Sequence, residues 1–253
     1  MNRGGVGHLE KELVIFGHRG YSGVAPENTM AAFGETLKAG ATGFELDVHL
    51  TREGELVVCH DELLDRTTNG SGLLMEKSLG ELKALDAGGW YGESFRGEAI
   101  PTLREALQLV VDTDYWVNIE LKNSLIWYEG IEEKVIQLTY EMQLQDQIIL
   151  SSFNHNSMVK VRQLDKNLRT GILYSCVLVE PWDYVSRLGA TSVHPSLLSI
   201  NGEIVDKFHE KGLKVYPYFD GGYEEISHVT KEELLALGVD GIFTNYIHRY
   251  TAT

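Results

Sequence analysis

The chain has 253 residues, of which 43% are hydrophobic and 23% are charged, a composition typical of folded globular proteins and not of disordered chains. Its 22 basic and 37 acidic side chains give a formal net charge of −15, which argues against charge-driven binding to nucleic acid or to an anionic membrane surface. No apolar run approaches the roughly 18 residues that a membrane span requires, so stable membrane insertion is not expected.

Two features predict the compartment. The only two cysteines, Cys59 and Cys176, suit a reducing environment, because a chain of this length needs no disulfide to stabilise its core. The N-terminal stretch Met1–Glu12 is polar and glycine-rich, without the hydrophobic segment of a secretory signal. Together they predict a cytoplasmic protein.

Eight short apolar stretches recur along the chain, and most intervals between them carry helix-start signals, such as the capping boxes Ser78/Glu81, Thr102/Glu105 and Thr230/Glu233. Alternating strands and helices predict a parallel sheet, and eight repeats in about 250 residues predict a closed (β/α)8 TIM barrel. The alternative is an open doubly wound sheet, which usually carries a GxGxxG turn that is missing here. The predicted strands are Leu13–Gly17, Gly43–Asp47, Tyr115–Leu121, Gln147–Ser152, Arg169–Tyr174, Ala190–His194, Leu213–Tyr218 and Asp240–Thr244.

One segment departs from this alternation. The apolar runs that end near Arg52 and begin at Leu56 are too close for a parallel crossover, so Val48–His60 is predicted to form an antiparallel hairpin. The hairpin would return His60 to the end of the second strand. Residues 61–101 then form a small insertion after the second barrel strand, expected to cap the C-terminal face where barrel enzymes keep their active sites.

Acidic side chains interrupt two of the predicted strands. Glu45 and Asp47 are two residues apart and therefore share one face of the second strand, and Glu120 lies near the end of the third. Neighbouring strands are about 4.8 Å apart, so the three carboxylates can converge. Three buried carboxylates need a cation, and an all-oxygen site suits Mg²⁺ or Ca²⁺ better than zinc.

Two histidines flank this acidic cluster. His18 follows the first strand and His60 ends the hairpin, and such a pair is suited to act as general acid and general base. Arg19 and Lys122 add positive charge beside them, as an anionic phosphodiester requires. Among the other histidines, His49 alone shares the face of Glu45 and Asp47, although a structural role is its default interpretation.

The chain resembles the glycerophosphodiester phosphodiesterases. The resemblance extends over about Leu13 to Tyr246 and implies a single TIM-barrel domain, residues 1–253, with a capping insertion. The motifs that carry it are His18-Arg19-Gly20, Ala25-Pro26-Glu27-Asn28-Thr29, Phe44-Glu45-Leu46-Asp47-Val48, Val58-Cys59-His60-Asp61, Leu64-Asp65-Arg66-Thr67-Thr68-Asn69-Gly70-Ser71-Gly72, Ile100-Pro101-Thr102-Leu103 and Asn118-Ile119-Glu120-Leu121-Lys122.

The resemblance also implies roles and an activity. The family's metal ligands match Glu45, Asp47 and Glu120, its catalytic pair matches His18 and His60, and its phosphate contacts match Arg19 and Lys122. The implied reaction is metal-dependent hydrolysis of small-molecule glycerophosphodiesters to glycerol 3-phosphate and an alcohol.

Two segments depart from the family pattern. The family's late Trp-Thr-Val-Asn reads Tyr218-Phe219-Asp220-Gly221 here, and its closing Thr-Asp-x-Pro reads Thr244-Asn245-Tyr246-Ile247. Both are expected to line the mouth opposite the metal and so to affect the pocket for the glycerol or the alcohol.

Three other functions compete with this interpretation. A related phosphodiesterase for lysophospholipids or phosphoinositides would need apolar surface at the mouth, which Trp90, Tyr91, Phe95, Trp127 and Tyr128 are candidates to supply. A silent binding protein would not need the full set of acid, base and ligands. A sugar-acting or aldolase-type enzyme lacks support, because Schiff-base chemistry favours a desolvated lysine rather than one among carboxylates. A symmetric homodimer is expected only from the general frequency of such dimers.

Overall fold

The computed structural model describes residues 12–251, so nearly all of Met1–Glu12, including His8, lies outside the described residues. Within them, eight strands pair in parallel in the order β8-β7-β6-β5-β4-β2-β1-β9. Their bounds are β1 Val14–Gly17, β2 Gly43–Leu50, β4 Trp116–Leu121, β5 Ile148–Ser152, β6 Arg169–Tyr174, β7 Ser192–Pro195, β8 Lys214–Val215 and β9 Gly241–Thr244.

The sheet is nearly closed into a barrel. Beyond the end of β8, Tyr218 forms a parallel bridge with Phe243 of β9, and the Phe243 N–H donates to the Pro217 carbonyl at 3.0 Å. The predicted (β/α)8 barrel is therefore confirmed. The predicted strand Leu213–Tyr218 is longer than β8, because Pro217 has no N–H to donate to a sheet ladder.

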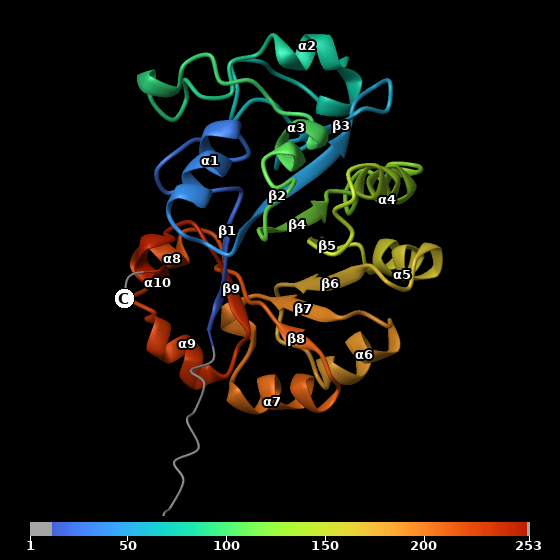
Figure 1. Cartoon of the computed structure of the whole chain (residues 1–253), viewed down its shortest axis with the longest axis vertical. Helices are drawn as coiled ribbons and strands as arrows, with labels where there is room; N and C mark the ends of the chain where they lie inside the picture. The colour runs from blue at the N-terminus through green and yellow to red at the C-terminus, as the bar shows by residue number, and fades with distance from the viewer. Residues whose placement is uncertain (1–11, 252–253) are drawn as a thin grey trace, which may run out of the picture.

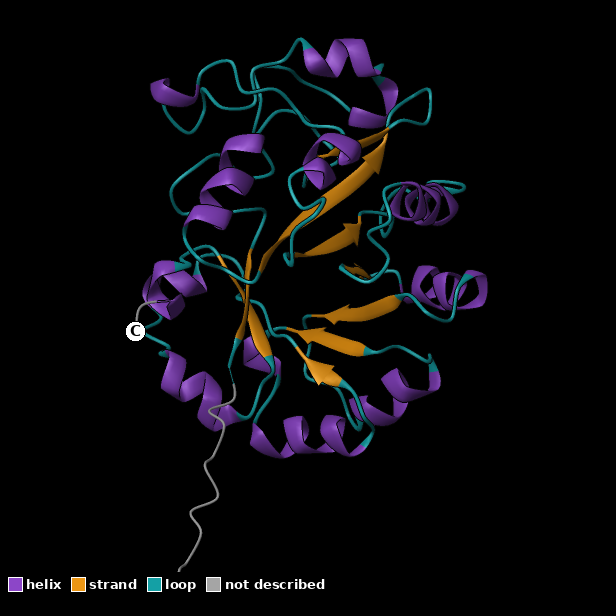
Figure 2. Cartoon of the chain, viewed as in Figure 1, coloured by secondary structure: helices purple, strands orange, loops and turns teal. Residues whose placement is uncertain are grey.

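Helices surround the barrel (Figures 1 and 2). All three predicted capping boxes are present, at the starts of α2, α3 and α9. Among the described residues, none of the helices combines the length and the apolar character that a membrane span requires. The helices around the barrel are α1 Met30–Lys38, α3 Leu103–Gln108, α4 Ile131–Glu141, α5 His155–Leu164, α6 Pro181–Arg187, α7 Gly202–Glu210, α8 Tyr223–Ile226, α9 Lys231–Leu237 and α10 His248–Thr251.

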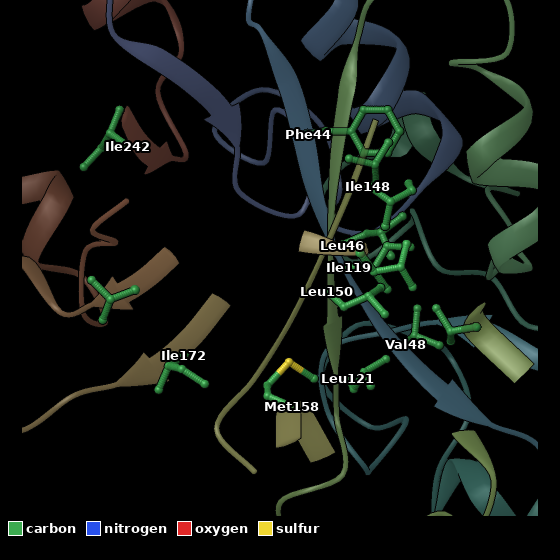
Figure 3. Packing of buried hydrophobic residues seen from close by; sticks show 14 of the residues in the cluster. Phe44, Leu46, Val48, Ile119, Leu121, Ile148, Leu150, Met158, Ile172 and Ile242 are labelled. Atoms are coloured by element: carbon green, nitrogen blue, oxygen red, sulfur yellow. The ribbon is translucent and has the colours of Figure 1, made fainter. Parts of the chain in front are cut away.

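The alternation of side chains along β2 separates the core from the site. Phe44, Leu46 and Val48 join the large apolar cluster between the strands and the helices (Figure 3). Glu45 and Asp47 point the opposite way, into the barrel, because successive side chains of a strand face opposite sides. One strand thus contributes both to the packing and to the chemistry.

The hairpin and the insertion form a second packing unit, seen beyond α1 and α3 at the top of Figure 1. Strand β3, Leu56–Val58, pairs antiparallel with β2, as the sequence predicts. The insertion adds the 3-10 turns Leu74–Glu76 and Glu93–Phe95 and the helix α2, Leu79–Lys83. Its own apolar cluster includes Val57, Leu64 and Leu82, so this segment is packed rather than loose.

Gly43 permits the close approach of β2 and β4. A Cβ at this position would lie 1.9 Å from the Trp116 carbonyl oxygen, which belongs to backbone that cannot move alone. We expect Gly43→Ala to lower the free energy of unfolding by about 1–3 kcal/mol or more, measured by urea denaturation.

Gly202→Ala is the matched control, since a Cβ there meets nothing within 4 Å and Gly202 begins helix α7. This variant should be unchanged or more stable by up to about 1 kcal/mol. Equal denaturation midpoints for the two variants would contradict the close approach.

Candidate active site

Three carboxylates meet inside the barrel at the C-terminal ends of β2 and β4. Parallel pairing aligns Asp47 with Glu120 and Glu45 with Asn118. One oxygen of each of Glu45, Asp47 and Glu120 lies within 4.8 Å of the others. The structure therefore brings together the three residues that the sequence singles out as metal ligands.

The carboxylates experience different surroundings. Burial, then Asp47 and Glu120, raises the pKa of Glu45 well above its usual range. Burial also raises the pKa of Glu120, although Lys122 partly offsets it. Burial alone would raise the pKa of Asp47, but His60, Lys122 and Arg19 together hold it below its usual range. Ionising all three carboxylates together therefore costs free energy unless positive charge lies beside them.

A tight turn after β1 aims Arg19 at this cluster. Arg19 has a φ of 58°, a left-handed conformation that is costly for a residue with a side chain. Its backbone N–H donates to Glu45 Oε2 at 2.7 Å, and its Nε lies 3.7 Å from Asp47 Oδ2. The next residue, Gly20, has a φ of 79°, and a Cβ there would lie 2.7 Å from Ala32. The strained turn places both the backbone and the side chain of Arg19 against the acids.

Asn28 holds Asp47 in place. Its Nδ2 donates to Asp47 Oδ2 at 2.8 Å, and its backbone N–H donates to the Arg19 carbonyl. The N-cap of α1 is the next residue, Thr29, whose side chain accepts from the Ala32 N–H. Asn28, with a φ of 58°, is thus free to orient the carboxylate.

His18 is held by Asn245, the residue that follows strand β9. Its Nδ1 lies 2.9 Å from Asn245 Oδ1, an acceptor, so Nδ1 carries the proton and Nε2 has a free lone pair. Burial, followed by the charge of Arg19, lowers the pKa of His18 to about 3, so the ring is neutral near pH 7. Asn245 is itself fixed by Glu224, which accepts from its backbone N–H at 2.8 Å.

The hairpin delivers His60 to the opposite side of the acids. Its Nδ1 lies 2.5 Å from Asp61 Oδ1, and its Nε2 lies 3.2 Å from Lys122 Nζ. Buried His49 contacts the His60 carbonyl through Nε2 at 3.2 Å and Tyr128 through Nδ1 at 3.0 Å. His49 therefore supports the His60 backbone and does not line the site.

Lys122 is surrounded by site residues. Its Nζ lies 2.9 Å from Glu120 Oε1 and 3.6 Å from Asp47 Oδ1. Burial would lower the pKa of Lys122, but Glu120 and Asp47 outweigh it and raise that pKa above its usual range. Lys122 is therefore a fixed positive charge between two of the acids and His60.

An ion-pair network that the sequence analysis did not identify connects the two sides. Arg66 from the insertion lies 2.6 Å from Asp61 Oδ2 through Nε and 2.8 Å from Glu27 Oε2 through a terminal nitrogen. Glu27 Oε1 then pairs with Arg19 at 2.8 Å. The chain of contacts runs from His60 to Arg19 across three separate segments. Glu27, Asp61 and Arg66 all fall within the quoted motifs, but no spacing along the chain predicts that they meet.

The acids and histidines line a cavity of about 560 Å³ that has a polar and an aromatic side. His18, Arg19, Glu45, His60 and Glu120 belong to its polar side, whereas Asp47 and Lys122 are not among its lining residues. Both segments that depart from the family pattern line it, as expected. The aromatic side consists of Trp90, Tyr91, Phe153, Tyr218, Phe219, Phe243 and Tyr246.

Three of the aromatic residues considered for the mouth lie elsewhere. Tyr128 is buried against His49, and Phe95 packs on Tyr91 with ring centroids 5.5 Å apart. Trp127 is exposed outside the cavity. Of the five aromatic residues considered from the sequence, Trp90 and Tyr91 line the cavity.

The polar wall fits a divalent cation. Glu45 Oε1 and Asn118 Oδ1 are buried acceptors without a hydrogen-bond partner among the described residues, and the two residues are register neighbours. When all three carboxylates are ionised, their charge exceeds that of Arg19 and Lys122 by one negative charge. A bound phosphodiester would add a second negative charge. One hard divalent cation would balance both charges and supply the missing partner for the oxygen ligands.

Comparison with known proteins identifies the family. A model described as the glycerophosphoryl diester phosphodiesterase family matches residues 18–249. The chain belongs to this family. A glycerophosphodiester phosphodiesterase of Caldanaerobacter subterraneus subsp. tengcongensis is 46% identical over 93% of this chain and 94% of its own, and one of Bacillus altitudinis is 39% identical over 93% and 95%. The protein is therefore a phosphodiesterase, as the resemblance implies.

Solved structures of the family share the fold. A phosphodiesterase of Oleispira antarctica, solved with the product sn-glycerol-3-phosphate, matches with a TM-score of 0.80 and 32% identity over 93% of this chain and 94% of its own. A glycerophosphoryl diester phosphodiesterase described as putative, from Silicibacter pomeroyi, matches with a TM-score of 0.83 and 26% identity over 95% and 92%. The likeness includes nearly the whole barrel.

The acidic cluster predicts cation-dependent stability. Adding Mg²⁺ or Ca²⁺ to chelator-treated protein should raise Tm, because binding to the folded state alone stabilises it by about 2.7 kcal/mol at a hundredfold excess over Kd. Glu45→Gln should remove most of this shift. Exposed Glu203→Gln on α7 should keep it. Equal shifts in both variants would place the cation elsewhere.

Proposed function

We propose that the protein hydrolyses glycerophosphodiesters to glycerol 3-phosphate and an alcohol, with one divalent cation and two catalytic histidines. The observation that carries the proposal is the convergence of His18, His60 and three carboxylates on one cavity. The Oleispira antarctica relative, whose structure contains sn-glycerol-3-phosphate, supports this choice of product.

Glu45, Asp47 and Glu120 would hold the cation, which supplies positive charge where the phosphate gains negative charge. Arg19 forks onto the phosphate oxygens from the strained turn. Lys122 assists as a fixed charge beside Glu120. The insertion, residues 61–101, covers this face and is part of the same catalytic domain, since Arg66, Trp90 and Tyr91 line the cavity.

The two histidines carry the protons. The glycerol 2-hydroxyl is the attacking group: its oxygen bonds to phosphorus while the bond to the leaving alcohol breaks, and water then opens the cyclic phosphate. This route needs a glycerol head and no protein nucleophile. His18, neutral and with its Nε2 lone pair free, accepts the hydroxyl proton.

His60 protonates the leaving alkoxide. A histidine that acts as a general acid carries positive charge before it reacts. The Asp61 carboxylate beside Nδ1 compensates that charge, and Lys122 Nζ, 3.2 Å from Nε2, has to withdraw when Nε2 takes up its proton. Asn245, the partner of His18, has a neutral carboxamide, which does not compensate a positive charge on the ring. The two partners therefore favour His18 as base and His60 as acid.

The first experiment is release of glycerol 3-phosphate from glycerophosphocholine and glycerophosphoethanolamine. We expect release with Mg²⁺ or Ca²⁺ and none with EDTA. Release that persists undiminished in EDTA would contradict the metal requirement. No release with any metal would contradict the substrate class.

Replacing either histidine should slow the reaction. We expect His18→Ala and His60→Ala each to lower kcat by about 10²–10⁴-fold, the usual contribution of general acid–base catalysis. His209→Ala is the control, since His209 lies at the end of α7 and contacts Asp240. Near-normal turnover in both site variants would exclude the two-histidine scheme.

The leaving group tests which histidine is the acid. A p-nitrophenyl ester of glycerol 3-phosphate expels a weakly basic phenolate that needs little protonation. His60→Ala should therefore recover most of its lost rate on this ester, whereas His18→Ala should not. Recovery by His18→Ala instead would reverse the two roles.

The aromatic side of the cavity favours one second candidate, a lysophospholipid substrate. Trp90 and Phe153 offer apolar surface to an acyl chain at the mouth. Comparing kcat/KM for glycerophosphocholine and its acylated form separates the two. A much higher value for the acylated form would favour the second candidate.

A further inference from the structure

The barrel face that carries the active site also carries the most exposed apolar side chains. Among residues 12–251, the six large hydrophobic side chains with the greatest exposure range from 58% for Leu198 to 91% for Val179. All six follow the C-terminal ends of β4, β6, β7 and β8. We call this set the apolar rim: Leu125, Trp127, Val177, Val179, Leu198 and Ile226.

The apolar rim follows the mouth of the cavity. Strands β4 to β8 are consecutive neighbours in the sheet, so the loops that leave their C-terminal ends lie side by side. Phe153, in the loop after β5, is exposed between rim loops and lines the cavity. Across the mouth, the insertion exposes Trp90. Isolated exposed apolar residues are ordinary, but several on neighbouring loops of the face that carries the cavity indicate an interaction surface.

The rim loops carry neither lysine nor arginine. Segments 123–130, 153–154, 175–180, 196–201 and 219–230 contain neither lysine nor arginine, whereas they contain Glu129, Glu180, Asp220, Glu224 and Glu225. Attraction to anionic lipids depends on lysine and arginine near the surface. The protein has a net charge of −15, and its apolar rim has no lysine or arginine to attract an anionic surface. The rim therefore suits a partner whose surface carries no net charge and whose interior is apolar.

We propose that the apolar rim docks the active-site face on the surface of a zwitterionic phospholipid bilayer. Single side chains at separate loop tips can each enter between head groups, with Trp127 suited to the interface. A folded protein or a second copy seated on the rim would close the mouth, whereas a fluid lipid surface leaves the cavity accessible to molecules that leave the membrane. This docking goes beyond the proposed reaction and does not depend on it.

Binding to vesicles tests the proposal directly. Wild-type protein should sediment with sucrose-loaded phosphatidylcholine vesicles, and adding phosphatidylserine should not increase binding. Val177→Ser/Val179→Ser should lower the partition coefficient by about tenfold or more, since two exposed valines lose their burial in lipid. Neither valine lines the cavity, so hydrolysis of soluble glycerophosphocholine and Tm serve as controls for folding.

The chain offers a matched control and a probe. Leu164 is an exposed leucine at the end of α5, where a barrel helix reaches the opposite face, so Leu164→Ser should bind vesicles like the wild type. Cys176 is exposed within a rim loop, whereas burial raises the pKa of the Cys59 thiol to about 12. A polarity-sensitive dye on Cys176 should shift its emission to the blue with phosphatidylcholine vesicles.

Four results would overturn the proposal. They are the absence of vesicle binding by the wild type, binding only when phosphatidylserine is present, equal binding by the wild type and the double valine variant, and a dimer in light scattering that this variant dissociates. The last result would assign the rim to a second copy. Failure of the proposed reaction would appear separately, as vesicle binding without release of glycerol 3-phosphate.

Discussion

Three carboxylates buried within 4.8 Å of one another are the constraint on which the rest of the site depends. Such a cluster is costly in a low-dielectric interior unless positive charge and hydrogen-bond donors surround it. The strained turn at Arg19, the side chain of Asn28 and the buried Lys122 all meet this need. Of these three groups, Arg19 also lines the cavity, so in the proposed reaction it would balance the acids and contact the phosphate.

The β2–β4 register makes the cluster feasible. Aligning Asp47 with Glu120 puts acids on the inner face of both strands while Leu46 and Ile119 pack outward. A shift of one residue would reverse every side chain and bury the acids among helices. Gly43 pairs with Trp116 in this register and leaves no room for a Cβ. The close packing of β2 and β4 is therefore needed for the geometry of the site.

Most of the fold was predictable, because its signals are local. Alternating apolar stretches, capping boxes and the short connection before Leu56 depend on residues close in the chain, and the structure has the predicted barrel and hairpin. The convergence of Glu45, Asp47 and Glu120 was also predictable, since strand periodicity and parallel order determine it together.

What could not be predicted depends on contacts between distant segments. Asn245 lies 227 residues from His18, and Arg66 lies 39 residues from Glu27, so no local pattern pairs them. The orientation of Tyr128 toward the core was missed for the same reason, since exposed and buried aromatic residues look alike in sequence. Only the folded chain shows which polar side chain contacts each of the two site histidines and three carboxylates.

The site residues are divided unequally along the chain. The histidines, the acids, Arg19 and Lys122 all precede residue 123, whereas most of the aromatic wall, from Phe153 to Tyr246, follows residue 150. Asn245 and its partner Glu224 connect the second half to His18. In the proposed reaction, changes confined to the second half would therefore alter the wall of the cavity and leave the acids and both histidines in place, a route by which this barrel would reach new substrates through one half alone.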